Sequence, residues 1–113
     1  MHEMAICHSI RVIIEEQAVA QGFARVERIR LAIGALSGVE IEALRFGFDV
    51  AMAGSPGEGA LLEIDEVPGA AWCLACAAQV VIAQRYAPCP QCGSHQLQVN
   101  GGQDMTISEM EVN

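Results

Sequence analysis

Cys73-Leu74-Ala75-Cys76 and, after twelve further residues, Cys89-Pro90-Gln91-Cys92-Gly93 are the stretch that constrains this chain most strongly. Two CxxC pairs at such a separation can bring four thiolates to one tetrahedral ion, with each sulfur about 2.3 Å from a zinc. Pro90 and Gly93 suit a tight turn at the second pair, because proline presets φ and glycine tolerates positive φ. Four sulfurs leave no open coordination position, so we expect a structural Zn(II) site in a zinc-ribbon-like module.

Other interpretations of these residues remain open at this point. A CxxC pair is also found in thiol oxidoreductases, but two pairs together favour a metal, and the βαβ context of thioredoxin is missing. His95 follows Cys92 by three residues and is either a supporting or substitute ligand or an ordinary exposed histidine in a turn. Cys7 falls on a predicted helix, and we interpret it as a small core residue rather than a ligand.

Charge and hydropathy exclude several classes of function. The 113 residues carry a net charge of −8, from 14 acidic and 6 basic side chains, and the basic ones are all arginine with no clustered tract. Nucleic-acid binding is therefore disfavoured, whereas protein partners or a cation are favoured. The mostly apolar run 70–83 is shorter than the roughly 20 residues that a membrane span needs. No secretory signal is expected either, so the chain is predicted to be cytoplasmic, where thiols stay reduced.

The first half of the chain predicts two helices around a strand. Apolar residues at helical spacing indicate a helix over about 4–21, ended by Gly22. The period changes to two in residues 25–33, where Ile29, Leu31 and Ile33 would face the core. Ser37 followed by Glu40 resembles a capping box, which predicts a second helix from there to about Met52. Apolar residues fill two adjoining stripes of this helix, so most of it is expected to be buried.

The second half predicts strands on either side of the cysteine module. Residues 61–67 and 105–112 have strand composition, and Val80 to Ile82 would be one strand of a zinc-ribbon hairpin. The expected fold is α+β: a small three-stranded sheet with two helices on one face, plus an inserted module. The predicted boundaries are 1–68 and 104–113 for the first domain and 69–103 for the module.

The amino-terminal sequence Met1-His2-Glu3 has a chemistry of its own. His2 is bulky and should prevent removal of Met1, which places a free α-amine beside an imidazole and backbone amides. Nickel(II) favours planar nitrogen coordination of this kind. Taken alone this pattern is weak, and a lone terminal histidine is usually without function.

Motifs along the whole chain resemble those of the HypA/HybF family of hydrogenase nickel-incorporation proteins. The resemblance rests on four segments: Met1-His2-Glu3, Gly34-Ala35-Leu36-Ser37-Gly38-Val39, Glu42-Ala43-Leu44-Arg45-Phe46 and the paired CxxC motifs. One difference is Ala77, where many members have glycine.

The resemblance implies a metallochaperone and not an enzyme, without catalytic residues. It implies that His2 binds nickel with the Met1 amine and the Glu3 backbone, and that Cys73, Cys76, Cys89 and Cys92 bind zinc. Ni(II) would be the transported ion, delivered to the [NiFe] hydrogenase large-subunit precursor together with a nickel-handling GTPase. Glu3 would also help to recognise that GTPase. The chain is expected to be a monomer or a weak homodimer that binds neither nucleic acid nor membranes. Some relatives also assist urease maturation.

The main alternative is a zinc-ribbon module for nucleic acid or transcription, which the absence of lysine and the charge of −8 disfavour.

Overall fold

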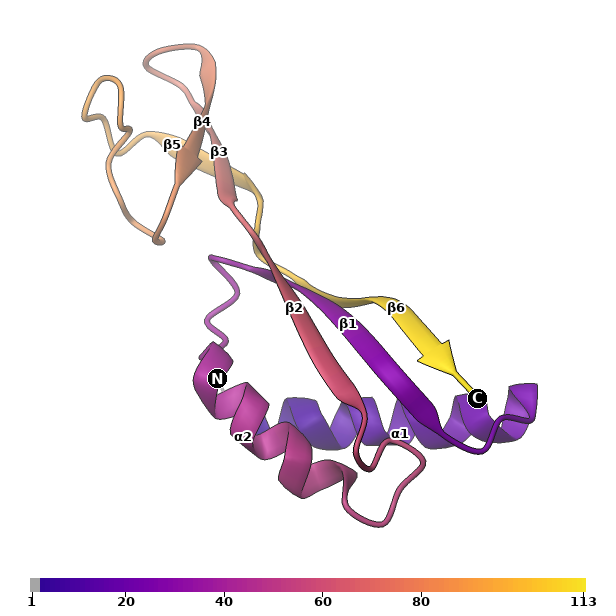
Figure 1. The fold of residues 1–113 in the computed structure, drawn as a ribbon. Coiled ribbons are helices and arrows are strands. Elements are labelled where there is room, and N and C mark those ends of the chain that lie inside the picture. The colour runs from indigo at the N-terminus through magenta and orange to yellow at the C-terminus, as the bar shows by residue number, and fades with distance from the viewer. Residues whose placement is uncertain (1–2) are drawn as a thin grey trace. The chain divides into compact units, whose positions relative to one another are not determined.

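The computed structural model describes residues 3–113, which form two helices and two three-stranded sheets (Figure 1). Their order is α1 (Glu3–Gln21), β1 (Val26–Gly34), α2 (Ile41–Met52), β2 (Leu61–Val67), β3 (Gly69–Cys73), β4 (Ala78–Ile82), β5 (Leu97–Gly101) and β6 (Met105–Val112). The first sheet has the strand order β2-β1-β6 and the second has the order β4-β3-β5. The α+β class, with one sheet carrying the helices and a separate cysteine-bearing module, is confirmed.

Contacts divide the chain into two compact units. The first, here called the helical unit, contains the described residues up to Leu31 together with Val39–Ile64 and Ile107–Asn113. The second, the cysteine unit, contains Ala32–Gly38 and Asp65–Thr106. Neither α1 nor α2 is long and apolar enough to cross a membrane.

Helix α1 follows its predicted limits. Gly22 ends it in the left-handed conformation, with φ of +75°, and its N–H donates to the carbonyl of Ala18 at 2.9 Å. Cys7, Ile10 and Ile14 are buried and mark the face that packs into the core. This arrangement confirms the predicted glycine cap and the interpretation of Cys7 as a core residue.

Helix α2 begins later than the capping-box pattern predicts. Its N-cap is Glu40, whose carboxylate accepts a hydrogen bond from the N–H of Glu42 at 2.9 Å. Ser37 lies in the preceding turn, and Gly38 beyond it has φ of +79°. A left-handed residue cannot be part of a right-handed helix, so the prediction of Ser37 as the N-cap was wrong.

The expected burial of most of α2 was also wrong. Leu44, Phe48 and Ala51 are buried, but Phe46 is 75% exposed and Val50 55% exposed. Residues four apart along a helix share a face, so this second stripe lies together on the solvent side. Only one of the two apolar stripes therefore packs into the core.

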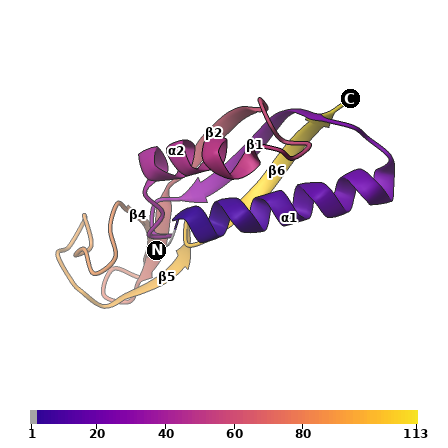
Figure 2. The ribbon, with the colours of Figure 1, turned by 90° about the horizontal axis from the view of Figure 1, so that it is seen from below.

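The sheet of the helical unit separates an apolar face from a charged one. Both helices lie on the same side of β2, β1 and β6 (Figure 2). Ile29 and Leu31 of β1 are fully buried. Arg28 and Arg30 alternate with them and make ion pairs with Glu63 on β2 and with glutamates of β6. This alternation confirms the period-two pattern predicted for β1.

The cysteine unit contains two strands that the sequence pattern did not predict. β3 lies in the centre and pairs antiparallel with both β4 and β5, so Ala71 faces Val80 on one side and Val99 on the other. Val80 and Ile82 of the predicted hairpin strand are buried, together with Ala71 and Leu36. The module is thus a three-stranded sheet.

Candidate metal centre

The structure brings the four cysteines of the two CxxC pairs together. Cys73 ends β3 and Cys76 lies in the turn before β4, while Cys89 and Cys92 lie in the connection from β4 to β5. Their sulfur atoms all lie within 4.8 Å of one another. All four are free thiols rather than disulfides, which leaves every sulfur available to a metal.

The spacing of the sulfurs fits a tetrahedral ion. Cys73 Sγ lies 3.7 Å from Cys92 Sγ, and Cys76 Sγ lies 3.9 Å from Cys89 Sγ. In a zinc site with bonds of about 2.3 Å, tetrahedral geometry places the sulfurs about 3.8 Å apart. The donor set and the spacing of these two pairs therefore fit a tetrahedral metal ion such as zinc.

Backbone N–H groups point at two of the sulfurs. The N–H of Cys76 donates to Cys73 Sγ and the N–H of Gln91 donates to Cys89 Sγ, both at 3.4 Å. Each turn then needs a left-handed residue after its second cysteine: Ala77 has φ of +53° and Gly93 has φ of +76°. Glycine suits this conformation, as predicted for Gly93, whereas Ala77 adopts it against the preference of its side chain.

The thiols differ in acidity because their surroundings differ. Hydrogen bonding to Cys92, burial and hydrogen bonds with the other two cysteines raise the pKa of Cys76 to about 12. Burial acts to raise the pKa of Cys89 as well, but hydrogen bonds from the N–H groups of Cys92 and Gln91, together with those of the Cys92 and Cys73 side chains, lower it to about 7. Of these two thiols Cys89 is therefore the more acidic.

The cluster is partly built into the core of its unit. Cys73 and Cys89 are buried with Val80 and Ile82, whereas Cys92 is exposed. Among the described residues, the group that can share one ion contains the four cysteines and not His95, which is exposed elsewhere on the unit.

The predicted nickel ligand His2 and the Met1 amine lie outside the described residues. Glu3, the first residue of α1, accepts a hydrogen bond from the N–H of Glu40 at 3.0 Å. This contact ties the start of α1 to the N-cap of α2, a connection that sequence reasoning missed because it joins residues far apart in the chain.

Cys7 lies one turn further along α1 and, within residues 3–113, is not a member of the group that can share one ion. It is fully buried and its Sγ donates to the carbonyl of Leu44 at 3.5 Å. Burial, and to a smaller extent the charge of Glu3, raise the pKa of the Cys7 thiol. A neutral buried thiol of this kind is a packing residue.

Comparison with known proteins places the chain in a family. The family model described as hydrogenase/urease nickel incorporation, metallochaperone, HypA matches residues 1–112. The chain belongs to the HypA family. The hydrogenase maturation factor HypA of Azorhizobium caulinodans is 60% identical over 112 residues, and that of Xanthobacter autotrophicus is 54% identical, in each case over 99% of both chains. The resemblance seen in the sequence motifs is confirmed.

Solved structures agree on the fold. The solution structure of the nickel metallochaperone HypA from Helicobacter pylori has a TM-score of 0.70 with this chain and covers 99% of it, at 23% identity. A second HypA solution structure has a TM-score of 0.72 and covers the whole chain. HypA proteins are metallochaperones for nickel incorporation. The chain is therefore a nickel-incorporation maturation factor by family.

Proposed function

We propose that this chain carries Ni(II) at its amino terminus and delivers it to the large-subunit precursor of a [NiFe] hydrogenase, in concert with a nickel-handling GTPase. The observation that carries this proposal is the match of a nickel metallochaperone family over residues 1–112, which includes Met1-His2-Glu3. The protein would catalyse no reaction, and the ion is its cargo. We expect it to act in the cytoplasm, where its five thiols stay reduced.

The chemistry of the first three residues supports a nickel site. A free α-amine, the imidazole of His2 and the backbone nitrogens of His2 and Glu3 are the donors that Ni(II) takes in a square plane. The carboxylate of Glu3 is already hydrogen-bonded to the N–H of Glu40. Glu3 is thus held by two helices, which favours a backbone role for it at the nickel ion.

The four-cysteine cluster supports a second, structural metal. We propose that Cys73, Cys76, Cys89 and Cys92 bind one Zn(II), because their sulfur spacing fits a closed tetrahedral shell. A full shell suits a permanently bound ion better than a transported one. In the same proposal residues 69–103 form the zinc-binding module, and 1–68 with 104–113 form the nickel-binding domain.

The partners follow from the cargo. A net charge of −8 suits a carrier that handles a cation and docks on proteins rather than on nucleic acid. The expected partners are the GTPase and the hydrogenase precursor, and the carrier itself is expected to be a monomer or a weak homodimer.

Nickel titration of the zinc-loaded protein tests the terminal site. Ni(II) is titrated into the untagged chain, into His2→Ala and into a chain extended by residues before Met1. Both changes remove a donor from the square plane, so we expect stoichiometric nickel binding to be lost while zinc stays at one per chain.

His8→Ala and His95→Ala are the matched controls, because each removes an exposed histidine elsewhere in the chain. Both should bind nickel like the unaltered protein. Unchanged nickel affinity in His2→Ala and in the extended chain would show that the terminal site is wrong.

Zinc analysis tests the cluster separately. Each of the four substitutions Cys73→Ser, Cys76→Ser, Cys89→Ser and Cys92→Ser should lower the zinc content, whereas Cys7→Ala should leave it at one per chain. Zinc retained in full by the cluster variants would contradict the proposed ligands.

A further inference from the structure

Charged residues are almost absent from one stretch of this acidic chain. Residues 68–103 contain none of the 14 acidic side chains and a single arginine, Arg85, in company with one histidine, His95. Their other polar residues are mostly glutamines and an asparagine. Arg85 is the one arginine of a stretch without carboxylates, which favours an anionic partner there.

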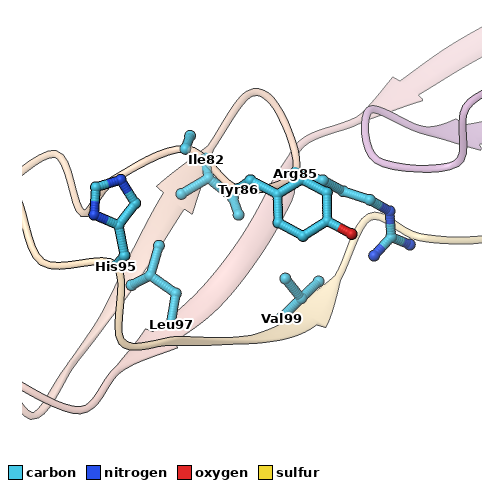
Figure 3. Close-up of a pocket in the computed structure, with 7 residues that line it drawn as sticks. Ile82, Arg85, Tyr86, His95, Leu97 and Val99 are labelled. Carbon is cyan, nitrogen blue, oxygen red and sulfur yellow. The ribbon is translucent and has the colours of Figure 1, made fainter.

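A pocket lies between these two residues. It has a volume of about 200 Å³, and its lining combines apolar side chains of β4 and β5 with polar ones at the ends: Ile82, Arg85, Tyr86, Ala87, His95, Leu97 and Val99. Figure 3 shows Arg85 and His95 at opposite ends of the pocket, with Leu97 and Val99 along one side. The pocket lies wholly within the cysteine unit.

Tyr86, which lines this pocket, has an unusual exposure and an unusual backbone conformation. Its side chain is 93% exposed, and its backbone has φ of +67°, a conformation that residues other than glycine adopt at a cost. Neither exposure of an aromatic ring nor this backbone conformation stabilises the fold. Such strain is concentrated at binding sites, where a side chain must be presented to a partner.

Arg85 is exposed, but its guanidinium is held in position by two hydrogen bonds. Its Nε donates to the carbonyl of Leu36 at 3.1 Å and its Nη2 donates to Gln103 Oε1 at 3.4 Å. A guanidinium fixed in this way loses little side-chain entropy when it binds a carboxylate. The charge is therefore preorganised at one end of the pocket.

We propose that this pocket is a docking site for a partner-protein segment that places one apolar side chain over Leu97 and Val99 and an adjacent carboxylate at Arg85. The volume is below the roughly 300–1,000 Å³ of ordinary small-molecule sites, so it suits a single side chain of a partner. The exposed ring of Tyr86 covers the apolar side chain from outside. Docking here does not depend on the nickel site.

Peptide titration followed by amide NMR tests the proposal on the zinc-loaded full chain. The probe is the capped peptide Gly-Leu-Glu-Glu-Gly, and the comparison peptides replace both glutamates with lysine or the leucine with glycine. We expect shifts confined to the pocket residues for the first peptide, and at least tenfold weaker binding for the other two. Acetate, as a simple carboxylate, should give no saturable shifts.

Three variants separate docking from stability. Arg85→Gln should weaken peptide binding about threefold to fivefold and reduce its salt dependence, as for loss of an exposed ion pair. Tyr86→Asn tolerates the left-handed backbone, so it should weaken binding about tenfold while leaving the zinc content unchanged. Arg45→Gln, which removes a cation from α2, should bind like the unaltered chain.

The proposal is overturned if the lysine peptide or acetate gives the same shifts as the acidic peptide. It is also overturned if Tyr86→Asn, with its zinc retained, binds the acidic peptide unchanged. His2→Ala, which should lose nickel binding, should bind the peptide with unchanged affinity. The docking proposal and the nickel-site proposal are therefore tested independently of each other.

Discussion

Ala77 adopts a backbone conformation that alanine disfavours. It closes the first CxxC turn with φ of +53°, the position at which Gly93 closes the second turn with φ of +76°. A side chain in this conformation costs about 1–2 kcal/mol, whereas the extra freedom of an unfolded glycine costs only about 0.5–1 kcal/mol. The alanine is thus a local source of instability beside the metal cluster.

We predict that Ala77→Gly stabilises the cysteine unit. The difference between those two costs is a gain of about 0.5–1 kcal/mol in the free energy of unfolding. Guanidinium titration of the zinc-loaded protein measures it, with the fluorescence of Trp72, the single tryptophan and a residue of β3, as the signal. Ala75→Gly, in the same turn but without positive φ, should be destabilising instead; a similar gain in both variants would contradict the explanation.

The residue-level predictions from sequence succeeded where the determining neighbours are close along the chain. Each CxxC pair is closed by a single turn, as its spacing predicts, and Gly22 ends α1 through a bond to Ala18, four residues back. The capping box at Ser37 failed because Gly38 takes a left-handed conformation that the sequence pattern allows but does not require. The contact of Glu3 with Glu40 joins distant residues, so no local pattern indicated it.

At the scale of elements, Gly47 sets how closely α1 and α2 approach. A Cβ at this position would lie 2.7 Å from the Sδ of Met4 and 3.4 Å from the Sγ of Cys7. Alanine would gain about 1 kcal/mol of helix propensity, but overpacking costs about 1–3 kcal/mol. Met4 is 39% exposed and its side chain is flexible, so the cost should lie at the lower end.

We therefore predict that Gly47→Ala changes the stability of the helical unit by less than about 0.5 kcal/mol while moving the side chain of Met4. Methyl NMR of labelled methionines should show a shifted Met4 signal. Ala43→Gly, at an exposed position of the same helix, should simply lose about 1 kcal/mol. A loss of 2 kcal/mol or more in Gly47→Ala would mean that the start of α1 cannot adjust.

Arg28 connects all three strands of the sheet that carries the helices. Its guanidinium lies 2.6 Å from Glu63 on β2 and 2.9 Å and 3.1 Å from Glu109 and Glu111 on β6. Hydrogen bonds to Glu63 and Glu111, followed by the charge of Glu63, raise the pKa of Arg28 above the ordinary arginine value. The positive charge therefore compensates three carboxylates that would otherwise repel one another.

We predict that Arg28→Gln lowers the urea midpoint of the helical unit, because three facing carboxylates lose their main counter-charge. The decrease should become smaller when NaCl is raised from about 0.01 M to about 1 M, since salt screens the remaining repulsion. Arg45→Gln is the control, because Arg45 donates to the backbone carbonyl of Leu62 rather than to a carboxylate. An equal loss at both salt concentrations would exclude charge compensation as the cause.

The elements that the sequence did not predict depend on pairing rather than on composition. β3 begins Gly69-Ala70-Ala71, residues with little strand preference, and it forms because β4 and β5 both bond to it. The two apolar stripes of α2 gave no indication of which one would pack, since that depends on where α1 lies. By contrast β2 and β6 were predicted with their bounds, because their composition is typical of strands.

At the scale of the whole molecule, the two units obtain their stability from different sources. The helical unit buries large apolar side chains, among them Ile10, Ile14 and Phe48. The cysteine unit has about 50 residues, and two members of its small buried cluster, Cys73 and Cys89, are proposed metal ligands. Domains this small often need a metal or a disulfide to fold, and a structural zinc contributes on the order of 10 kcal/mol.

We predict that removing the metal unfolds the cysteine unit and leaves the helical unit folded. With a strong chelator, Trp72 fluorescence should shift to the red, while most of the circular dichroism at 222 nm should remain because both helices belong to the other unit. A thiol reagent should then label four cysteines quickly and Cys7 slowly, since Cys7 is fully buried and its pKa is raised by burial. Cys7→Ala serves as the control and should keep its metal and its Trp72 signal before chelation. Loss of the helical signal together with the Trp72 signal would mean that the metal stabilises both units. The amino-terminal nickel site could then not be studied apart from the cysteine cluster.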